Sequence, residues 1–218
     1  MASWFPVGLC WAQGDPRTFD GPWLPEEAEC VARAIPKRKR EFGLGRALAR
    51  QVARELGHAL GPMPPGSDRR PPWPSELRMS IAHCEDLCVV LGARSEAFVT
   101  IGVDVEPVGV SMTGLIEHVT TASERARWTR DLNPEAWAAA TFVAKEAFYK
   151  AQFELTERVL EFDDVRCVFD APPGPHKVSF TCTPHRGPAL SGEIVRTEGH
   201  WMGWSAPRAS QMDASPSR

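Results

Sequence analysis

The sequence lacks the features that would place it in a membrane or on nucleic acid. No apolar stretch approaches the roughly 20 residues that a membrane-spanning helix needs. The first residues, Met1 to Pro6, have neither the charged start nor the apolar run of a signal peptide. The formal net charge of −3 gives no general attraction for nucleic acid. We therefore expect a cytoplasmic protein with reduced cysteines and with no membrane or nucleic-acid partner.

Metal-binding cysteine motifs are also missing. The six cysteines include no Cys-x-x-Cys pair, and their scatter is unlike a zinc framework. His83 and Cys84 with Cys88 could be interpreted as metal ligands, but buried thiols that pack as small apolar residues are the favoured interpretation. With 43% hydrophobic and 24% charged residues, the 218-residue chain suits one large globular domain or two small ones that share a core.

Hydrophobic periodicity predicts two helices in the first half of the chain. Residues 25–35 form the first, which Pro36 ends. The second covers about residues 38–60, because large apolar residues recur there every four positions. These residues are Leu44, Leu48, Val52, Leu56 and Leu60. A loop rich in Pro, Gly and Arg follows over residues 61–74.

Two strands are predicted next, over residues 87–93 and 98–106, joined by a polar turn. Side chains alternate between the two faces of a strand. One face of the second strand therefore carries Ile101, Val103 and Val105, and the other carries Gly102, Asp104 and Glu106. Pro107 cannot donate to a sheet ladder and ends the strand.

The second half begins with a capping-box pattern, Thr121-Ala122-Ser123-Glu124, before a short helix. Asn133 and Pro134 then start the main helix of this half, which should continue to about Phe153. Four strands are predicted after it, over residues 165–169, 177–183, 189–196 and 201–206.

This order of elements predicts an α+β fold with two similar lobes packed side by side, related by a pseudo-twofold axis, and with the active site at their interface. The N-terminal lobe, residues 1–107, would hold the basic helix, the His83 segment and the strand with Asp104 and Glu106. The C-terminal lobe, residues 108–206, would hold the helix with Lys145, Glu146 and Lys150 and the antiparallel strands. Residues 207–218 are predicted to be a disordered tail.

Asp104 and Glu106 are candidates for binding a cation. They lie two residues apart on one strand face, so their carboxylates can converge on one ion, which would relieve their repulsion. Gly102 leaves room for a close approach on that face. The alternative is a solvent-facing acidic pair on a half-exposed strand.

The later helix adds a third carboxylate and two lysines. Glu146 and Lys150 are four residues apart and share a helix face, whereas Lys145 lies about 100° around the helix. A Glu–Lys pair at this spacing is also common on surfaces. Here it is embedded among aromatic residues, namely Phe142, Phe148, Tyr149 and Phe153. Three acids around a hard divalent cation, with lysines nearby for phosphate, form the minimum set for phosphoryl chemistry.

The basic residues of the first half do not indicate a binding site by themselves. The run from Lys37 to Arg40 is usually a solvated helix face. A lone histidine such as His83 is more often structural than a ligand. The order of the motifs along the chain is more informative, because it is similar to that of a known family.

The ordered motifs resemble the 4′-phosphopantetheinyl transferases of the compact type that activates enterobactin and surfactin synthetases. The motifs are Arg38-Lys39-Arg40-Glu41-Phe42 with Arg46, Pro71-Pro72-Trp73-Pro74, Ser80-Ile81-Ala82-His83-Cys84, the Gly-x-Asp-x-Glu strand from Ile101 to Glu106, and the Lys-Glu-x-x-x-Lys helix from Phe142 to Lys150. Ala82 and Asp86 depart from the usual pattern, but neither departure removes a charged group.

The resemblance implies a holo-[carrier-protein] synthase. Such an enzyme transfers the 4′-phosphopantetheine moiety of coenzyme A to a serine of an acyl or peptidyl carrier protein and releases adenosine 3′,5′-bisphosphate. Magnesium is the expected ion, with manganese as the alternative. The expected partners are coenzyme A and carrier proteins of polyketide, non-ribosomal peptide or fatty acid synthesis. The enzyme itself is expected to be a monomer.

The resemblance also implies residue roles. Asp104, Glu106 and Glu146 would hold the ion, and Glu146 would act as general base, directly or through water. Lys150 would stabilise the departing pyrophosphate oxygen. The residues expected to bind coenzyme A are Arg38, Arg46, Arg69, Ser80, His83, Asp104, Lys145 and Lys150.

Two alternatives stay open at this point. A magnesium-dependent phosphodiesterase or nuclease also gathers carboxylates, but it predicts a second ion and more clustered acids than three. A catalytically silent interaction module would be expected to have lost some of Asp104, Glu106, Glu146 and the two lysines.

Overall fold

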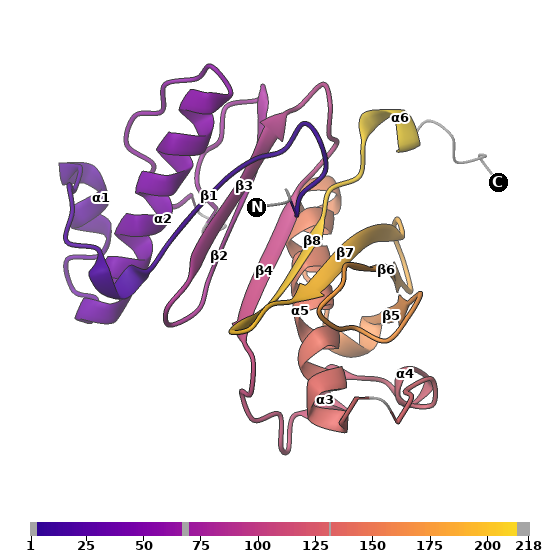
Figure 1. The fold of residues 1–218 in the computed structure, drawn as a ribbon. Helices are drawn as coiled ribbons and strands as arrows, with labels where there is room; N and C mark the ends of the chain where they lie inside the picture. Colours follow the sequence, from indigo (N-terminus) through magenta and orange to yellow (C-terminus); the bar gives the residue numbers. More distant parts are fainter. Residues whose placement is uncertain (1–3, 67–69, 131, 213–218) are drawn as a thin grey trace. The chain divides into compact units, whose positions relative to one another are not determined.

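The computed structural model describes residues 4–66, 70–130 and 132–212 (Figure 1). The chain divides after Phe98 into two compact units, each with its own sheet. This division differs from the predicted boundary at residue 107. The strand with Asp104 and Glu106 belongs to the second unit, because it pairs with a strand near the C-terminus.

The first unit is a three-stranded sheet covered by a long helix. Its described elements are β1 (Cys10–Gly14), the 3-10 helix η1 (Pro16–Thr18), α1 (Pro25–Cys30), α2 (Pro36–Glu55), β2 (Leu77–His83) and β3 (Cys88–Arg94). The strand order is β1-β3-β2, and both pairings are antiparallel. The predicted apolar stripe of α2 is buried against the sheet through Leu44, Leu48 and Val52.

Helix α2 begins and ends earlier than predicted. Pro36 occupies its first turn, where a missing N–H costs nothing, so Pro36 starts this helix. The prediction that Pro36 ends the preceding helix was wrong, because α1 already ends at Cys30. At the other end, α2 stops at Glu55, and Gly57 has a φ of +85°, which is left-handed. Glycine adopts this conformation without a steric penalty and commonly ends helices.

The second unit is a five-stranded sheet with one long helix across it. Its described elements are β4 (Gly102–Pro107), α3 (Ile116–Val119), α4 (Ala122–Arg125), α5 (Pro134–Thr156), the 3-10 helix η2 (Phe162–Asp164), β5 (Val165–Phe169), β6 (Val178–Pro184), β7 (Leu190–Arg196), β8 (His200–Ser205) and α6 (Ala209–Met212). The strand order is β4-β8-β7-β6-β5, with antiparallel neighbours throughout. Strand β4 therefore lies at an edge of this sheet, beside the last strand of the chain.

Helix α5 forms where its caps predict. Asn133 Oδ1 accepts a hydrogen bond of 2.7 Å from the backbone N of Ala136, and Pro134 occupies the first turn. The helix packs on β4, β8 and β7 and lies behind these strands in the view of Figure 1. Its alanine-rich side lets the sheet approach closely, and Phe148 is fully buried in the resulting core. The predicted capping box of Thr121 and Glu124 is also present.

The mixed helix-and-strand class is confirmed, whereas the side-by-side arrangement and twofold relation of two lobes stay predictions. Strands β1 and β2 were not predicted. The turn predicted after β3 does not make a hairpin, because β3 and β4 belong to different sheets. Within the predicted tail, α6 is a single helical turn, and residues 213–218 lie outside the described residues.

Two further expectations concern membrane-spanning helices and the cysteines. Among the described residues, no helix combines the length and apolar character needed to cross a membrane. Cys84, Cys88, Cys167 and Cys182 are buried. Burial raises the pKa of the Cys84 thiol to about 11, so this side chain packs as a protonated thiol.

Candidate active site

The polar face of β4 lies directly against α5. Gly102 shows how close the two elements are, because a Cβ atom added there would come within 1.9 Å of the backbone O of Ala147. On the neighbouring strand, Gly203 pairs with Asp104, and a Cβ there would lie 3.0 Å from Val143. Glycines on both strands thus allow the helix to approach the face that carries Asp104, as the alternation pattern predicted.

Asp104 and Lys150 join the strand to the helix. Lys150 Nζ donates a hydrogen bond of 2.8 Å to Asp104 Oδ1 and one of 2.9 Å to the backbone O of Val103. Asp104 is only 8% exposed, and its Oδ2 is buried and accepts no hydrogen bond from the described residues. The Lys150 side chain is 33% exposed, so its ammonium is within reach of solvent.

Glu106 and Glu146 share the electrostatic environment of Asp104. Burial, followed by the charge of Asp104, raises the pKa of Glu106 to about 7, while Lys150 opposes the change. Burial also raises the pKa of Glu146, with Asp104 raising it and Lys150 lowering it. Each carboxylate is therefore more costly to ionise because Asp104 is charged nearby. Asp104, Glu106, Glu146 and Lys150, which the sequence singled out, thus act on one another electrostatically at this contact.

Lys145 lies in a different place from the one predicted. Its side chain is fully buried, and its ammonium donates to the backbone O of Val119 at 3.0 Å, to the backbone O of Phe162 at 2.9 Å and to Glu124 at 3.1 Å. An ammonium has three protons, so these acceptors use all of them. The expected contact with a phosphate is replaced by an anchor inside the second unit.

Glu124 completes this anchor and was not predicted as a site residue. Besides Lys145, its carboxylate accepts from the backbone N of Thr121 at 2.6 Å and from the backbone N of Cys167 at 2.5 Å. It therefore links α4, β5 and α5 from a position that is 3% exposed. The capping box was the one signal in the sequence, and it indicated a helix start rather than a partner for Lys145.

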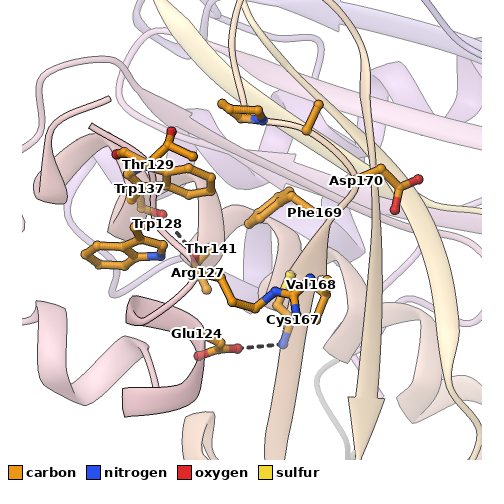
Figure 2. A pocket seen from close by; sticks show the side chains of 12 residues that line it. Glu124, Arg127, Trp128, Thr129, Trp137, Thr141, Cys167, Val168, Phe169 and Asp170 are labelled. Atoms are coloured by element: carbon orange, nitrogen blue, oxygen red, sulfur yellow. Dashed lines mark hydrogen bonds between the residues drawn. The ribbon is translucent and has the colours of Figure 1, made fainter. Parts of the chain in front are cut away.

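A pocket of about 370 Å³ lies beside this anchor. Figure 2 shows its aromatic side chains, Trp128, Trp137 and Phe169, together with the bond between Glu124 and the backbone of Cys167. The rings of Trp128 and Trp137 are stacked with 6.0 Å between centroids. None of the predicted site residues is among those that line the pocket, so we do not assign it to the reaction.

The first unit carries a separate cluster of basic residues. Arg38 Nη1 lies 3.0 Å from His83 Nε2, and His83 Nδ1 lies 3.8 Å from Glu41 Oε2. Because a guanidinium only donates, Nε2 of His83 accepts, and the ring proton is on Nδ1 on the side of Glu41. The Arg38 side chain is 52% exposed, so it can also reach an anion in solvent.

The other predicted residues of the first unit are less accessible. Arg46 is 6% exposed, donates from Nε to the backbone O of Met63 at 2.8 Å, and lies over the ring of Phe42. Burial lowers its pKa to about 10, which still leaves it charged at neutral pH. Ser80 is buried on β2. Arg69 lies outside the described residues.

The three carboxylates suit a hard divalent cation. Carboxylate oxygens are the ligands that magnesium and manganese prefer. Burial, followed by the charge of Asp104, raises the pKa of Glu106 and of Glu146, and Lys150 only partly opposes this. A dication would favour the ionised forms of all three groups.

Comparison with known proteins decides the family. The N-terminal domain of 4′-phosphopantetheinyl transferases matches residues 26–93, and the 4′-phosphopantetheinyl transferase superfamily matches residues 100–201. The chain belongs to the 4′-phosphopantetheinyl transferase superfamily. The two matches are separated between residues 93 and 100, where the structure of this transferase also divides.

Curated relatives agree with this assignment. The transferase is 34% identical to the 4′-phosphopantetheinyl transferase Svp of Streptomyces mobaraensis, over 82% of this chain and 73% of the relative. It is 37% identical to the 4′-phosphopantetheinyl transferase PptT of Mycobacterium tuberculosis, over 67% of this chain and 65% of the relative. It is 33% identical to enterobactin synthase component D of Escherichia coli K12, over 66% of this chain and 69% of the relative. These relatives give the phosphodiesterase or nuclease alternative no support.

Family membership has direct consequences for substrates. Membership makes this chain a phosphopantetheinyl transferase, and coenzyme A and a carrier protein are the partners that the family implies. Five of the residues predicted for the ion and the phosphates lie within the matched residues 100–201, namely Asp104, Glu106, Lys145, Glu146 and Lys150.

Proposed function

We propose that this transferase moves the 4′-phosphopantetheine moiety of coenzyme A to a serine hydroxyl of an acyl or peptidyl carrier protein, in a magnesium-dependent reaction that releases adenosine 3′,5′-bisphosphate. The observation that supports it is the bond of 2.8 Å from Lys150 to Asp104 at the contact of β4 with α5, where both groups also act electrostatically on Glu106 and Glu146. The carrier would come from polyketide, non-ribosomal peptide or fatty acid synthesis, in the cytoplasm.

Asp104, Glu106 and Glu146 would hold the ion. When bound, a divalent cation supplies positive charge to the pyrophosphate oxygens, where negative charge grows as the phosphoryl group is transferred. Glu146 is the proposed general base that takes the proton of the serine hydroxyl. Its raised pKa fits this role, because a base that titrates closer to neutral pH accepts a proton more readily.

Lys150 would stabilise the departing pyrophosphate oxygen. It has the exposure and the flexible stem that this needs, whereas Lys145 is buried and fully hydrogen-bonded. We therefore assign phosphate contact to Lys150 and a positioning role to Lys145. Arg38 and His83 would bind phosphates of coenzyme A, and Arg46 would support them by holding Met63 and the following loop.

The test is mass spectrometry of a carrier protein incubated with the enzyme, coenzyme A and magnesium. We expect a gain of one phosphopantetheine group on the carrier serine, and no gain with EDTA or with a carrier whose serine is replaced by alanine. Cleavage of coenzyme A without modification of the carrier would instead support a phosphodiesterase. Unmodified carrier and intact coenzyme A, across carriers of all three types, would refute the proposal.

A further inference from the structure

Lys150 is the counter-charge of the carboxylate cluster. Its ammonium lies 2.8 Å from Asp104 Oδ1 and also bonds the backbone O of Val103, so it is held at the strand rather than extended into solvent. It is also the group that lowers the pKa of both Glu106 and Glu146 against the effects of burial and of Asp104. One positive charge therefore faces three acids.

A divalent cation would compete with Lys150 for the negative charge of Asp104. Asp104 has two carboxylate oxygens, and Lys150 already occupies Oδ1. A dication close to this carboxylate would repel an ammonium only a few ångströms away, and it would neutralise the acids more fully than Lys150 does. The two cations therefore cannot both interact with Asp104 at full strength.

We propose that Lys150 neutralises Asp104 while the site holds no divalent cation, and that binding of the cation releases this lysine from Asp104. The inference rests on the proposed function, because it assumes that the three carboxylates are a cation site. Release of Lys150 would couple binding of the cation to contact between this lysine and a phosphate, and the reaction needs both. The ammonium can pair with a phosphate oxygen once the cation has taken over its role at Asp104.

Lys150 can leave its partner, whereas Lys145 is held in place. The Lys150 side chain is 33% exposed and carries its charge on a flexible stem with an open path to solvent. Lys145, one residue before Glu146, is enclosed completely and bonded to three acceptors. The helix thus carries one lysine that is fixed and one that can change its partner.

Calorimetric titration of magnesium and manganese tests this inference in the absence of coenzyme A. The proteins compared are the wild type, Lys150→Met, Lys150→Arg and the control Lys177→Met. Lys177 also pairs with an acid of the second unit, Glu193 at 3.4 Å, so its loss is a matched change of charge. The titrations are performed at pH 8, above the pKa of about 7 for Glu106, so that proton competition is small.

We expect Lys150→Met to bind both ions about threefold to tenfold more tightly than the wild type, because its competitor is gone. Lys150→Arg should not show this gain, and Lys177→Met should bind like the wild type. Unchanged or weaker binding by Lys150→Met would overturn the inference while leaving a cation-dependent transferase intact. A wild type that binds neither ion would overturn the cation site of the proposed function as well.

A measurement on the unmodified sequence keeps the test valid if Lys150→Met does not fold. In protein labelled with ¹⁵N-lysine, the Nζ resonance of Lys150, assigned with Lys150→Arg, should shift as magnesium is added. The Lys177 resonance should stay in place. A Lys150 resonance that does not move at saturating magnesium would show that the lysine remains on Asp104, and the inference would be wrong.

Discussion

The ammonium of Lys145 and the carboxylate of Glu124 form an ion pair of 3.1 Å, with side-chain exposures of 0% and 2%. The pair fixes the turn of α5 that carries Glu146 to α4 and β5, through the bonds of Glu124 to Thr121 and Cys167. Lys145 and Glu146 are neighbours in sequence, yet one is an internal anchor and the other belongs to the carboxylate cluster. Helix geometry requires this separation, because successive residues point about 100° apart.

Replacing Lys145 by methionine should destabilise the protein rather than specifically weaken coenzyme A binding. The change leaves the buried Glu124 without its charged partner, which typically costs about 3–5 kcal/mol. Urea denaturation followed by circular dichroism measures this loss. The double variant Lys145→Met, Glu124→Gln should regain part of the stability, because it removes the isolated charge. A stable Lys145→Met protein with weakened coenzyme A binding would support the phosphate contact that the sequence predicted.

Replacing Gly102 by alanine should force β4 and α5 apart. The added Cβ would lie 1.9 Å from the backbone O of Ala147, which is backbone and cannot rotate away. Overpacking typically costs about 1–3 kcal/mol, and we expect the upper end or more here. The control is Gly199→Ala, since a Cβ at Gly199 meets nothing within 4 Å. Thermal melting measures both variants, and equal melting temperatures would contradict the close contact.

The sequence predicted the local part of this site well. Alternation along β4 placed Gly102, Asp104 and Glu106 on one face, and the four-residue spacing placed Glu146 and Lys150 on one helix face. Both patterns depend only on geometry within one element. The prediction that β4 and α5 contribute to one site came from the family motifs, because hydrophobic periodicity gives no information on which elements meet.

The remaining features depend on packing between distant segments. Lys145 is directed inward because Glu124, Val119 and Phe162 gather around it, and these residues are between 17 and 26 positions away. Strand β4 belongs to the second unit because its partner is β8, about 100 residues later. A sequence read element by element has no signal for either relationship.

The stability of the cation-free protein should depend on pH through Glu106. Its pKa is about 7 in the folded protein, above the ordinary value of 4.5 that we assume for the unfolded chain. Between these values the folded state binds more protons, so stability decreases as pH rises from about 4.5 to about 7 and then levels off. The contribution is therefore fully present at low pH. Urea denaturation in EDTA from pH 5 to pH 8 should show that the free energy of unfolding decreases less in Glu106→Gln than in the wild type. The same pH dependence in both proteins would contradict this role of Glu106.

Replacing Arg38 by glutamine should weaken coenzyme A binding. Arg38 is exposed and contacts His83, and the change removes its charge without opening a buried space. A hydrogen bond to a charged group is typically worth about 1.5–3 kcal/mol, so a loss of about tenfold to a hundredfold in affinity is expected. Calorimetry with coenzyme A measures it, and Arg33→Gln, also exposed and basic, is the matched control. Equal affinities for the two variants would remove Arg38 from the binding site.

Replacing Glu146 by glutamine should stabilise the cation-free protein and abolish transfer. Burial and the charge of Asp104 both raise the pKa of Glu146, so its ionised form is unfavourable in the folded state when no cation is bound. A neutral amide of the same shape removes that cost, which should raise the melting temperature at pH 8 in EDTA. The amide cannot act as a base and is a weaker cation ligand, so phosphopantetheine transfer should decrease by at least about a hundredfold. Glu198→Gln, at an exposed position of the same unit, should change neither property. A Glu146→Gln protein that transfers phosphopantetheine at the wild-type rate would exclude Glu146 from the chemistry, and one that melts at a lower temperature would show that its charge stabilises the fold.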